Sequence, residues 1–125
     1  MTTTVLTAYI NGIGLLGPGL TGWADSQAIL AGTQTYISTT TALPSPSLLP
    51  AAERRRCGGI VKVTLATGLE ASTAAGLDPA MLACVYSASG SDGQNCHEIC
   101  LTLASADRHI SPTRFHNSVH NAAAG

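Results

Sequence analysis

Charged side chains are scarce in this sequence. Only 10% of its 125 residues are Asp, Glu, Lys or Arg, whereas a typical globular protein has about a quarter. Aromatic residues make up 4%, although hydrophobic residues reach 45%, so the apolar content is mostly Ala, Leu, Val and Ile. Such a chain has few charges to cover a surface and few large side chains to fill a core. We therefore expect part of its surface to be covered by further polypeptide or by a partner subunit.

Several classes of protein are excluded by what is missing. The net charge is −1 and the only basic run is Arg54–Arg56, which argues against nucleic acid as a partner. Gly, Pro, Thr and Asn interrupt every apolar run, so no membrane span is expected. The N-terminal Met1–Thr4 lacks the positive charge of a signal peptide. These features favour a cytoplasmic protein in which the four cysteines are free thiols.

The order of the apolar segments predicts an α/β fold in a single domain, residues 1–125. Buried strands are expected where short runs are apolar or β-branched, and helices where apolar residues recur at helical spacing. The expected strands are 4–10 and 81–87; the expected helices are 22–32, 51–75 and 94–106. Residues 33–50 are expected to form a long loop, and Gly76 to end the helix before it. This order implies parallel strands joined by crossover helices.

The densest group of polar side chains lies in Ser111–Asn121. Two imidazoles, two carboxamides, a guanidinium and the only Phe occur here. Such groups are costly to bury without partners, so this segment is expected to form a site or an interface. Asn117 or Ser118 is expected to cap a helix running through 119–124, with His116 and His120 on one face. Because that helix has barely begun at Gly125, we expect the chain to continue beyond it.

A G-x-G-x-x-G pattern, Gly12–Gly17, follows the first expected strand. In a dinucleotide fold these glycines would bring backbone N–H groups close to a pyrophosphate at a helix N-terminus. That fold also needs an acidic residue about 20 residues later, but positions 30–45 contain no Asp or Glu. Pro18 and Gly19 interrupt the helix where it should begin. A tight turn is the favoured interpretation, with nucleotide binding as the alternative.

Metal and thiol chemistry are also weakly indicated. Cys96, His97 and Cys100 lie at helical spacing, but there is no C-x-x-C pair to complete a zinc site. His116 and His120 form an H-x-x-x-H without the Glu of a metalloprotease helix. Cys84 lies in an apolar run and Cys57 beside the arginines, and neither is at a recognisable nucleophile turn. We predict no metal, no cofactor and no catalytic residue in this chain.

Five segments, in order, resemble the N-terminal part of ketosynthases of the thiolase fold. The last segment is the most specific, and it looks like the signature of the β-ketoacyl-synthase-like N-terminal family. The matching segments are Asn11–Gly19 with Trp23, Glu53–Arg56, Ala75–Asp78, Tyr86–Gly90 and Ser111–Gly125.

The resemblance implies the N-terminal part of a thiolase-like fold that is incomplete by itself. It implies a non-catalytic subunit, similar to the chain-length factors of aryl-polyene-type pathways. Such a subunit pairs with a catalytic ketosynthase, and meets acyl carrier protein only indirectly. In that family the nucleophilic Cys and catalytic His lie later in the chain, so no catalytic role carries over to any cysteine here. The candidates for interface or acyl-tunnel lining are Phe115, His116, Asn117, Val119 and His120.

Two alternatives remain open from the sequence. The chain could be the N-terminal part of an active 3-oxoacyl-carrier-protein synthase, whose reactive Cys would lie downstream. It could also be a small nucleotide-binding module that uses Gly12–Gly17. Nothing in the sequence indicates the acyl chain length, the pathway or the identity of the partner.

Overall fold

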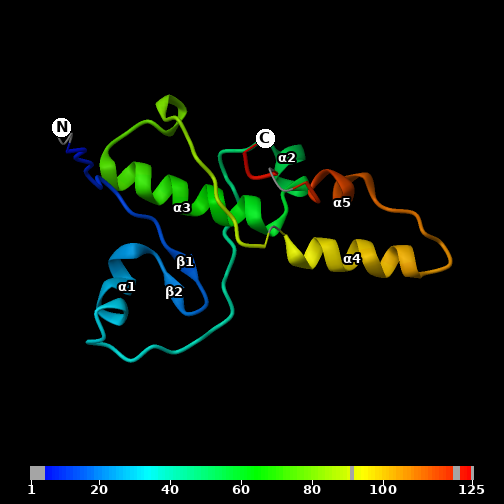
Figure 1. The fold of residues 1–125 in the computed structure, drawn as a ribbon, viewed down its shortest axis with the longest axis horizontal. Helices are drawn as coiled ribbons and strands as arrows, with labels where there is room; N and C mark the ends of the chain where they lie inside the picture. The colour runs from blue at the N-terminus through cyan, green and yellow to red at the C-terminus, as the bar shows by residue number, and fades with distance from the viewer. Residues whose placement is uncertain (1–4, 91, 120–121, 125) are drawn as a thin grey trace.

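A computed structural model of the chain describes residues 5–90, 92–119 and 122–124. The fold is rich in helices and its only assigned strands within these ranges form one short hairpin. Helix α3 runs through the middle of the molecule, with the hairpin and α1 on one side of it and residues 77–90 crossing on the other (Figure 1). The elements are β1 (Leu16–Gly17), β2 (Leu20–Thr21), α1 (Trp23–Leu30), α2 (Ala51–Arg56), α3 (Gly59–Ala75), the 3₁₀ helix η1 (Pro79–Met81), α4 (Gly93–Ala104) and α5 (Pro112–His116).

The hairpin forms because its turn sequence suits a tight reversal. Strands β1 and β2 are antiparallel, with Leu16 opposite Thr21, and Gly17 opposite Leu20. Pro18 and Gly19 form the turn, and Gly19 has a φ of 71°, which a residue with a side chain rarely adopts. The Tyr36 hydroxyl donates to the carbonyl of Pro18 at 2.8 Å. The Gly12–Gly17 run therefore leads into a hairpin, which the sequence analysis did not predict.

Glu70 on α3 ties this hairpin to α1. One of its carboxylate oxygens accepts the backbone N–H of Leu15 at 2.9 Å, and the other accepts the backbone N–H of Trp23, the first residue of α1. A carboxylate near a helix N-terminus also interacts favourably with the helix dipole. Gly22, which precedes α1, has no side chain that could cap the helix. The Glu70 carboxylate on α3 supplies that cap instead.

The helix predicted over 51–75 is divided into α2 and α3. Cys57 and Gly58, between them, have extended backbones, so the chain turns a corner there. Two consecutive glycines, Gly58 and Gly59, disfavour a continuous helix at this point. Gly76 ends α3 with a φ of 66°, which confirms the predicted C-cap. Helices α1 and α4 confirm the predictions over 22–32 and 94–106 to within a few residues.

Both strand predictions are wrong for the residues that the structure describes. Residues 5–10 and 82–87 have no assigned secondary structure, and η1 takes up the start of the second run. A strand requires a neighbouring strand for its backbone N–H and C=O groups. No ladder other than the β1–β2 hairpin is formed within the described ranges. The α/β class is therefore not established by this structure, which is a helix-rich fragment with one small hairpin.

Within the described part of the chain, Pro46 is the only apolar residue that is buried. The other buried side chains are those of Ser26, Ser72 and Asn117, which are 1%, 4% and 8% exposed. Many large apolar side chains are more than 80% exposed instead; they include Leu6, Tyr9, Ile10, Met81 and Val85. Hydrogen bonds from polar side chains therefore do much of the positioning that a core would otherwise do.

Candidate functional site

The segment that begins at Ser111 starts with a short helix. Pro112 is the first residue of α5, where its fixed φ fits the helix and its missing N–H is not needed. Asn117 follows the end of α5, and its backbone N–H donates to the carbonyl of Thr113 at 3.1 Å. The prediction that Asn117 or Ser118 would begin a helix through 119–124 is wrong for the described residues: 122–124 form a turn.

Asn117 is the buried residue of this segment. Its side-chain Nδ2 donates to the backbone carbonyls of Arg56 at 2.7 Å and Thr113 at 3.0 Å. Arg56 is the last residue of α2, where backbone carbonyls have no partner within the helix. The carboxamide therefore joins the end of α2 to α5 across 61 positions of sequence.

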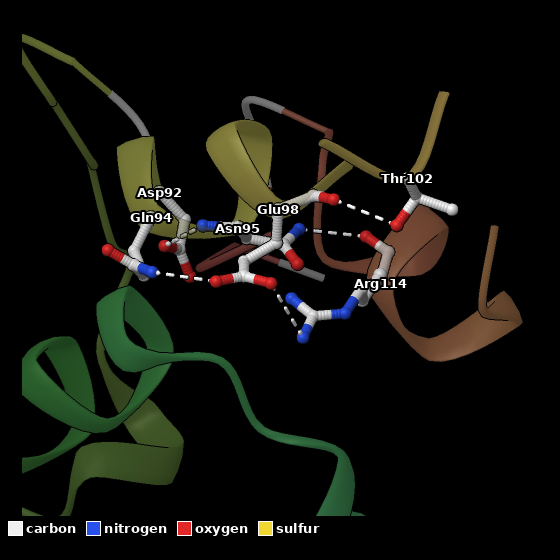
Figure 2. Close-up of polar contacts among 6 residues, drawn as sticks. All are labelled: Asp92, Gln94, Asn95, Glu98, Thr102 and Arg114. Atoms are coloured by element: carbon white, nitrogen blue, oxygen red, sulfur yellow. Dashed lines mark hydrogen bonds and ion pairs between the residues drawn. The ribbon is translucent and has the colours of Figure 1, made fainter. Parts of the chain in front are cut away.

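A second carboxamide joins α5 to α4, as Figure 2 shows. Nδ2 of Asn95 donates to the carbonyl of Arg114 at 2.8 Å, and the Arg114 guanidinium lies 3.4 Å from a carboxylate oxygen of Glu98. Gln94 donates to the other oxygen of Glu98 at 3.1 Å. Asp92 caps the helix by accepting the backbone N–H of Asn95 at 3.1 Å. The two contacts with Arg114 hold α5 against the first turns of α4.

Gly58 lies where the two sets of contacts meet. A Cβ at this position would lie 3.0 Å from Oδ2 of Asp92 and 3.5 Å from Cγ of Asn117. The absence of a side chain therefore lets the corner between α2 and α3 approach both α4 and α5. We call Arg56, Gly58, Asp92, Asn95, Arg114 and Asn117 the polar junction.

An apolar pocket lies beside the polar junction. Its volume is about 390 Å³. One wall is formed by Ile60 and Thr64 near the start of α3, a second by residues 84–88, and a third by Val119 with Ala122–Ala124. No Asp, Glu, Lys, Arg or His is among its lining residues. The arrangement suits an apolar chain rather than a polar or charged ligand.

The predicted site residues do not all meet at this pocket. Val119 lines it, whereas His116 lines a separate polar cleft of about 330 Å³ with Glu53, Arg56, Pro112 and Thr113. Asn117 is buried at the polar junction, and Phe115 is 65% exposed. His120 lies outside the described residues. The segment thus divides its side chains between an apolar and a polar environment.

Other residues of the site were not predicted. Asn95 and Glu98 were expected only as part of a helix, and nothing in their spacing indicates a contact with Arg114. Ile60 and Thr64 lie four residues apart at helical spacing, which indicates a shared face but not the pocket. Tyr86, in the wall formed by residues 84–88, has its pKa raised by a hydrogen bond with Cys84, and further by burial and by the electrostatic interaction with Cys84.

A wider groove lies along the adjacent face of α3. Its volume is about 590 Å³, and it runs between residues 9–12 on one rim and residues in 77–86 on the other. Leu65, Gly68 and Leu69 of α3 form part of its floor. No charged residue lines it. Each rim includes part of a run that was predicted to be a strand.

The first two glycines of the G-x-G-x-x-G pattern, Gly12 and Gly14, contact α3 instead of facing a helix N-terminus. A Cβ at Gly12 would overlap the carbonyl oxygen of Ala71, and one at Gly14 would overlap that of Thr67. The pattern therefore allows a loop to lie directly against a helix, which supports the interpretation as a tight turn. The geometry of a dinucleotide site, with the loop opening onto a helix, is not formed because β1 and β2 come first.

The cysteines give no combined site. All four are free thiols; Cys57 is partly buried and the other three are exposed. Within the described ranges, no group of three or more His, Cys, Asp or Glu side chains could hold a metal ion. No helix among the described residues is both long enough and apolar enough to cross a membrane.

Comparison with known proteins gives one match. No curated protein and no solved structure matches the chain. Residues 23–125 match the family model for the N-terminal domain of β-ketoacyl synthases. This match covers most of the chain, including the polar junction and the apolar pocket. The chain therefore belongs to the β-ketoacyl synthase N-terminal domain family.

Proposed function

We propose that the chain acts as a non-catalytic, chain-length-factor-like subunit beside a catalytic ketosynthase. The pair would elongate acyl or polyketide chains of the aryl-polyene type by decarboxylative condensation of carrier-protein thioesters, with the nucleophile in the partner. The observation that carries the proposal is the uncharged pocket of about 390 Å³ beside Val119, in a domain of the β-ketoacyl synthase family.

The pocket has the chemistry that an acyl chain requires. Its walls are mainly small or aliphatic side chains, and its volume lies within the range of about 300–1,000 Å³ found for small-molecule sites. The alanines at 122–124 leave room that larger side chains would fill. In the proposed role these residues contribute the shape of the cavity and exclude water from it, and the bonds are made elsewhere.

The exposed apolar surface supports a partner. Large contiguous apolar patches on a folded chain mark sites of interaction with other polypeptides. Val5 and Leu6 are 80% and 92% exposed, and Val85 is 98% exposed. We propose that the chain is the N-terminal part of such a subunit. Further strands would then pair with 5–10 and 82–87, and the thiolase-like sheet would be completed over α3.

The first test is to change the pocket in the presence of a ketosynthase. Val119→Trp should fill part of the pocket, so the yield of the longest product should fall about tenfold. A difference of one or two methylenes in an apolar pocket has an effect of that size. Leu103→Phe is the matched control, since Leu103 is exposed on α4 and does not line the pocket. An unchanged product distribution with Val119→Trp in an intact pair would contradict the proposal.

An active synthase is the second candidate, because the same family match and the same pocket would serve it. The two candidates differ in covalent chemistry. After incubation of the pair with an acyl-carrier-protein thioester, intact mass analysis should find the acyl adduct on the ketosynthase only. An acyl adduct on the polypeptide that contains this chain would favour the active synthase instead.

A further inference from the structure

We infer that Asn117 is a positioning residue that sets the separation between two walls of the apolar pocket, the wall on α3 and the wall that contains Val119. This inference rests on the proposed function of that pocket. It assigns Asn117 a role different from the one expected from the sequence: its side chain is buried beside the pocket and does not line it.

The first step of the argument concerns hydrogen bonding. A carboxamide has two N–H donors, and the Nδ2 of Asn117 makes both bonds, at 2.7 Å to the Arg56 carbonyl and 3.0 Å to the Thr113 carbonyl. Asn117 itself is 8% exposed. Loss of these donors would leave the Arg56 carbonyl without this partner, whereas the Thr113 carbonyl would keep the backbone N–H of Asn117.

The second step concerns what these bonds connect. Arg56 ends α2, and α3 begins at Gly59, so the bond from Asn117 holds the corner from which Ile60 and Thr64 extend. Toward the C-terminus, the chain leads from Asn117 to the facing wall. Only Ser118 separates Asn117 from Val119 of that wall. Ser118 is itself fixed, because its backbone N–H and its hydroxyl both bond to the carbonyl of Phe115, at 3.0 and 2.7 Å.

The third step separates Asn117 from the other carboxamide. Asn95 holds α5 to α4 through the Arg114 carbonyl, but neither Asn95 nor Arg114 lines the pocket. Asn117 is the side chain of the polar junction that bonds directly between α5 and the corner leading into α3. Loss of the Asn117 carboxamide should therefore change the shape of the pocket more than loss of a side-chain carboxamide on α4.

The test uses Asn117→Asp in the full chain paired with a ketosynthase. Aspartate keeps the shape of asparagine, but its carboxylate has no donor for the two carbonyls. Gln94→Ala is the matched control, because among the described residues its amide bonds only to Glu98, within α4. Two quantities are measured: hydrogen exchange at the amides of Ser118 and Ala122, and the distribution of product chain lengths.

With Asn117→Asp, both amides should exchange about tenfold faster, and the products should spread to a wider range of lengths. Gln94→Ala should change neither. A merely structural residue would lower the yield of folded pair without broadening the products.

Unchanged exchange in Asn117→Asp would overturn the inference, whatever the products are. Faster exchange with unchanged products, in a pair whose products do respond to Val119→Trp, would also overturn it and leave the proposed function standing. If Val119→Trp has no effect either, the proposed function fails, and the positioning role in elongation fails with it.

Discussion

At the scale of single residues, polar side chains fix the loops of this chain. Glu70 is the clearest case, because both carboxylate oxygens accept backbone N–H groups from a segment 47 to 55 positions away. Asn117 joins α2 and α5 with the opposite polarity, because its Nδ2 donates to the backbone carbonyls of Arg56 and Thr113. Such bonds matter more here than in most domains, since the described part of the chain has no buried aliphatic or aromatic side chain apart from Pro46.

Removal of the Glu70 carboxylate should release the hairpin and the start of α1. Hydrogen bonds to charged groups contribute about 1.5–3 kcal/mol each. In Glu70→Ala, the amides of Leu15 and Trp23 should therefore exchange at least about tenfold faster with solvent hydrogen.

Glu53→Ala is the control for loss of a glutamate, because the Glu53 side chain is exposed on α2. It should leave both amides unchanged. Equal exchange rates in Glu70→Ala and the unmodified chain would show that the carboxylate does not hold this loop.

Ser26 provides the opposite case. Its side chain is 1% exposed, and its hydroxyl has no hydrogen-bond partner in the described structure. An unsatisfied buried hydroxyl costs about 1–3 kcal/mol, so Ser26→Ala should stabilise α1 by about 1 kcal/mol. The amides in the last turn of α1 should exchange about fivefold more slowly. Faster exchange would indicate a partner for this hydroxyl.

At the scale of elements, α3 organises the fold and its glycines have different roles. Gly12 and Gly14 of the loop pack directly on its backbone, and Gly76 ends it in a left-handed conformation. Gly68, in contrast, lies within the helix, and nothing lies within 4 Å of the position of an added Cβ. Substitution by alanine should therefore have opposite effects on the stability of α3 at Gly68 and at Gly76.

Gly68→Ala should stabilise α3 and Gly76→Ala should destabilise its end. Alanine is favoured over glycine in a helix interior by about 1 kcal/mol, and a left-handed residue with a Cβ costs about 1–2 kcal/mol. Hydrogen exchange at Leu77, whose N–H donates to the Ser72 carbonyl, should become about fivefold faster in Gly76→Ala. Exchange in the middle of α3 should become slower in Gly68→Ala. Faster exchange in both variants, or slower exchange in both, would contradict these roles of Gly68 and Gly76.

The elements that sequence reasoning predicted well are those that depend on local interactions. Helices α1 and α4 and the Gly76 cap follow from spacing and from backbone preference. The runs 5–10 and 82–87 were predicted as strands from composition, but a strand depends on a neighbour that the described residues do not supply. The division at Cys57–Gly58 was indicated only by the weak helix preference of Gly58 and Gly59.

The site was predicted less well for the same reason. Val119 was expected near an acyl cavity, and the structure places it on an apolar pocket. The roles of Asn117 and Asn95 depend on contacts across 61 and 19 positions of sequence, which spacing cannot indicate. The family resemblance pointed to the segment as a candidate, and the structure separates Val119, which lines the pocket, from Asn117, which is buried beside it.

At the scale of the whole molecule, the chain exposes the surface that other domains bury. A domain of this size would normally bury well over half of the surface of its unfolded chain, and apolar burial is the main source of stability. We therefore predict that the isolated chain shows no cooperative thermal unfolding transition when followed by circular dichroism. A sharp transition of a monomer would contradict this prediction.

The most direct test of the central claim is coexpression of this chain with a ketosynthase from the same operon, followed by size-exclusion chromatography with mass detection. The proposed function predicts a one-to-one complex that contains both polypeptides. A well-folded monomer that elutes apart from the ketosynthase would contradict it.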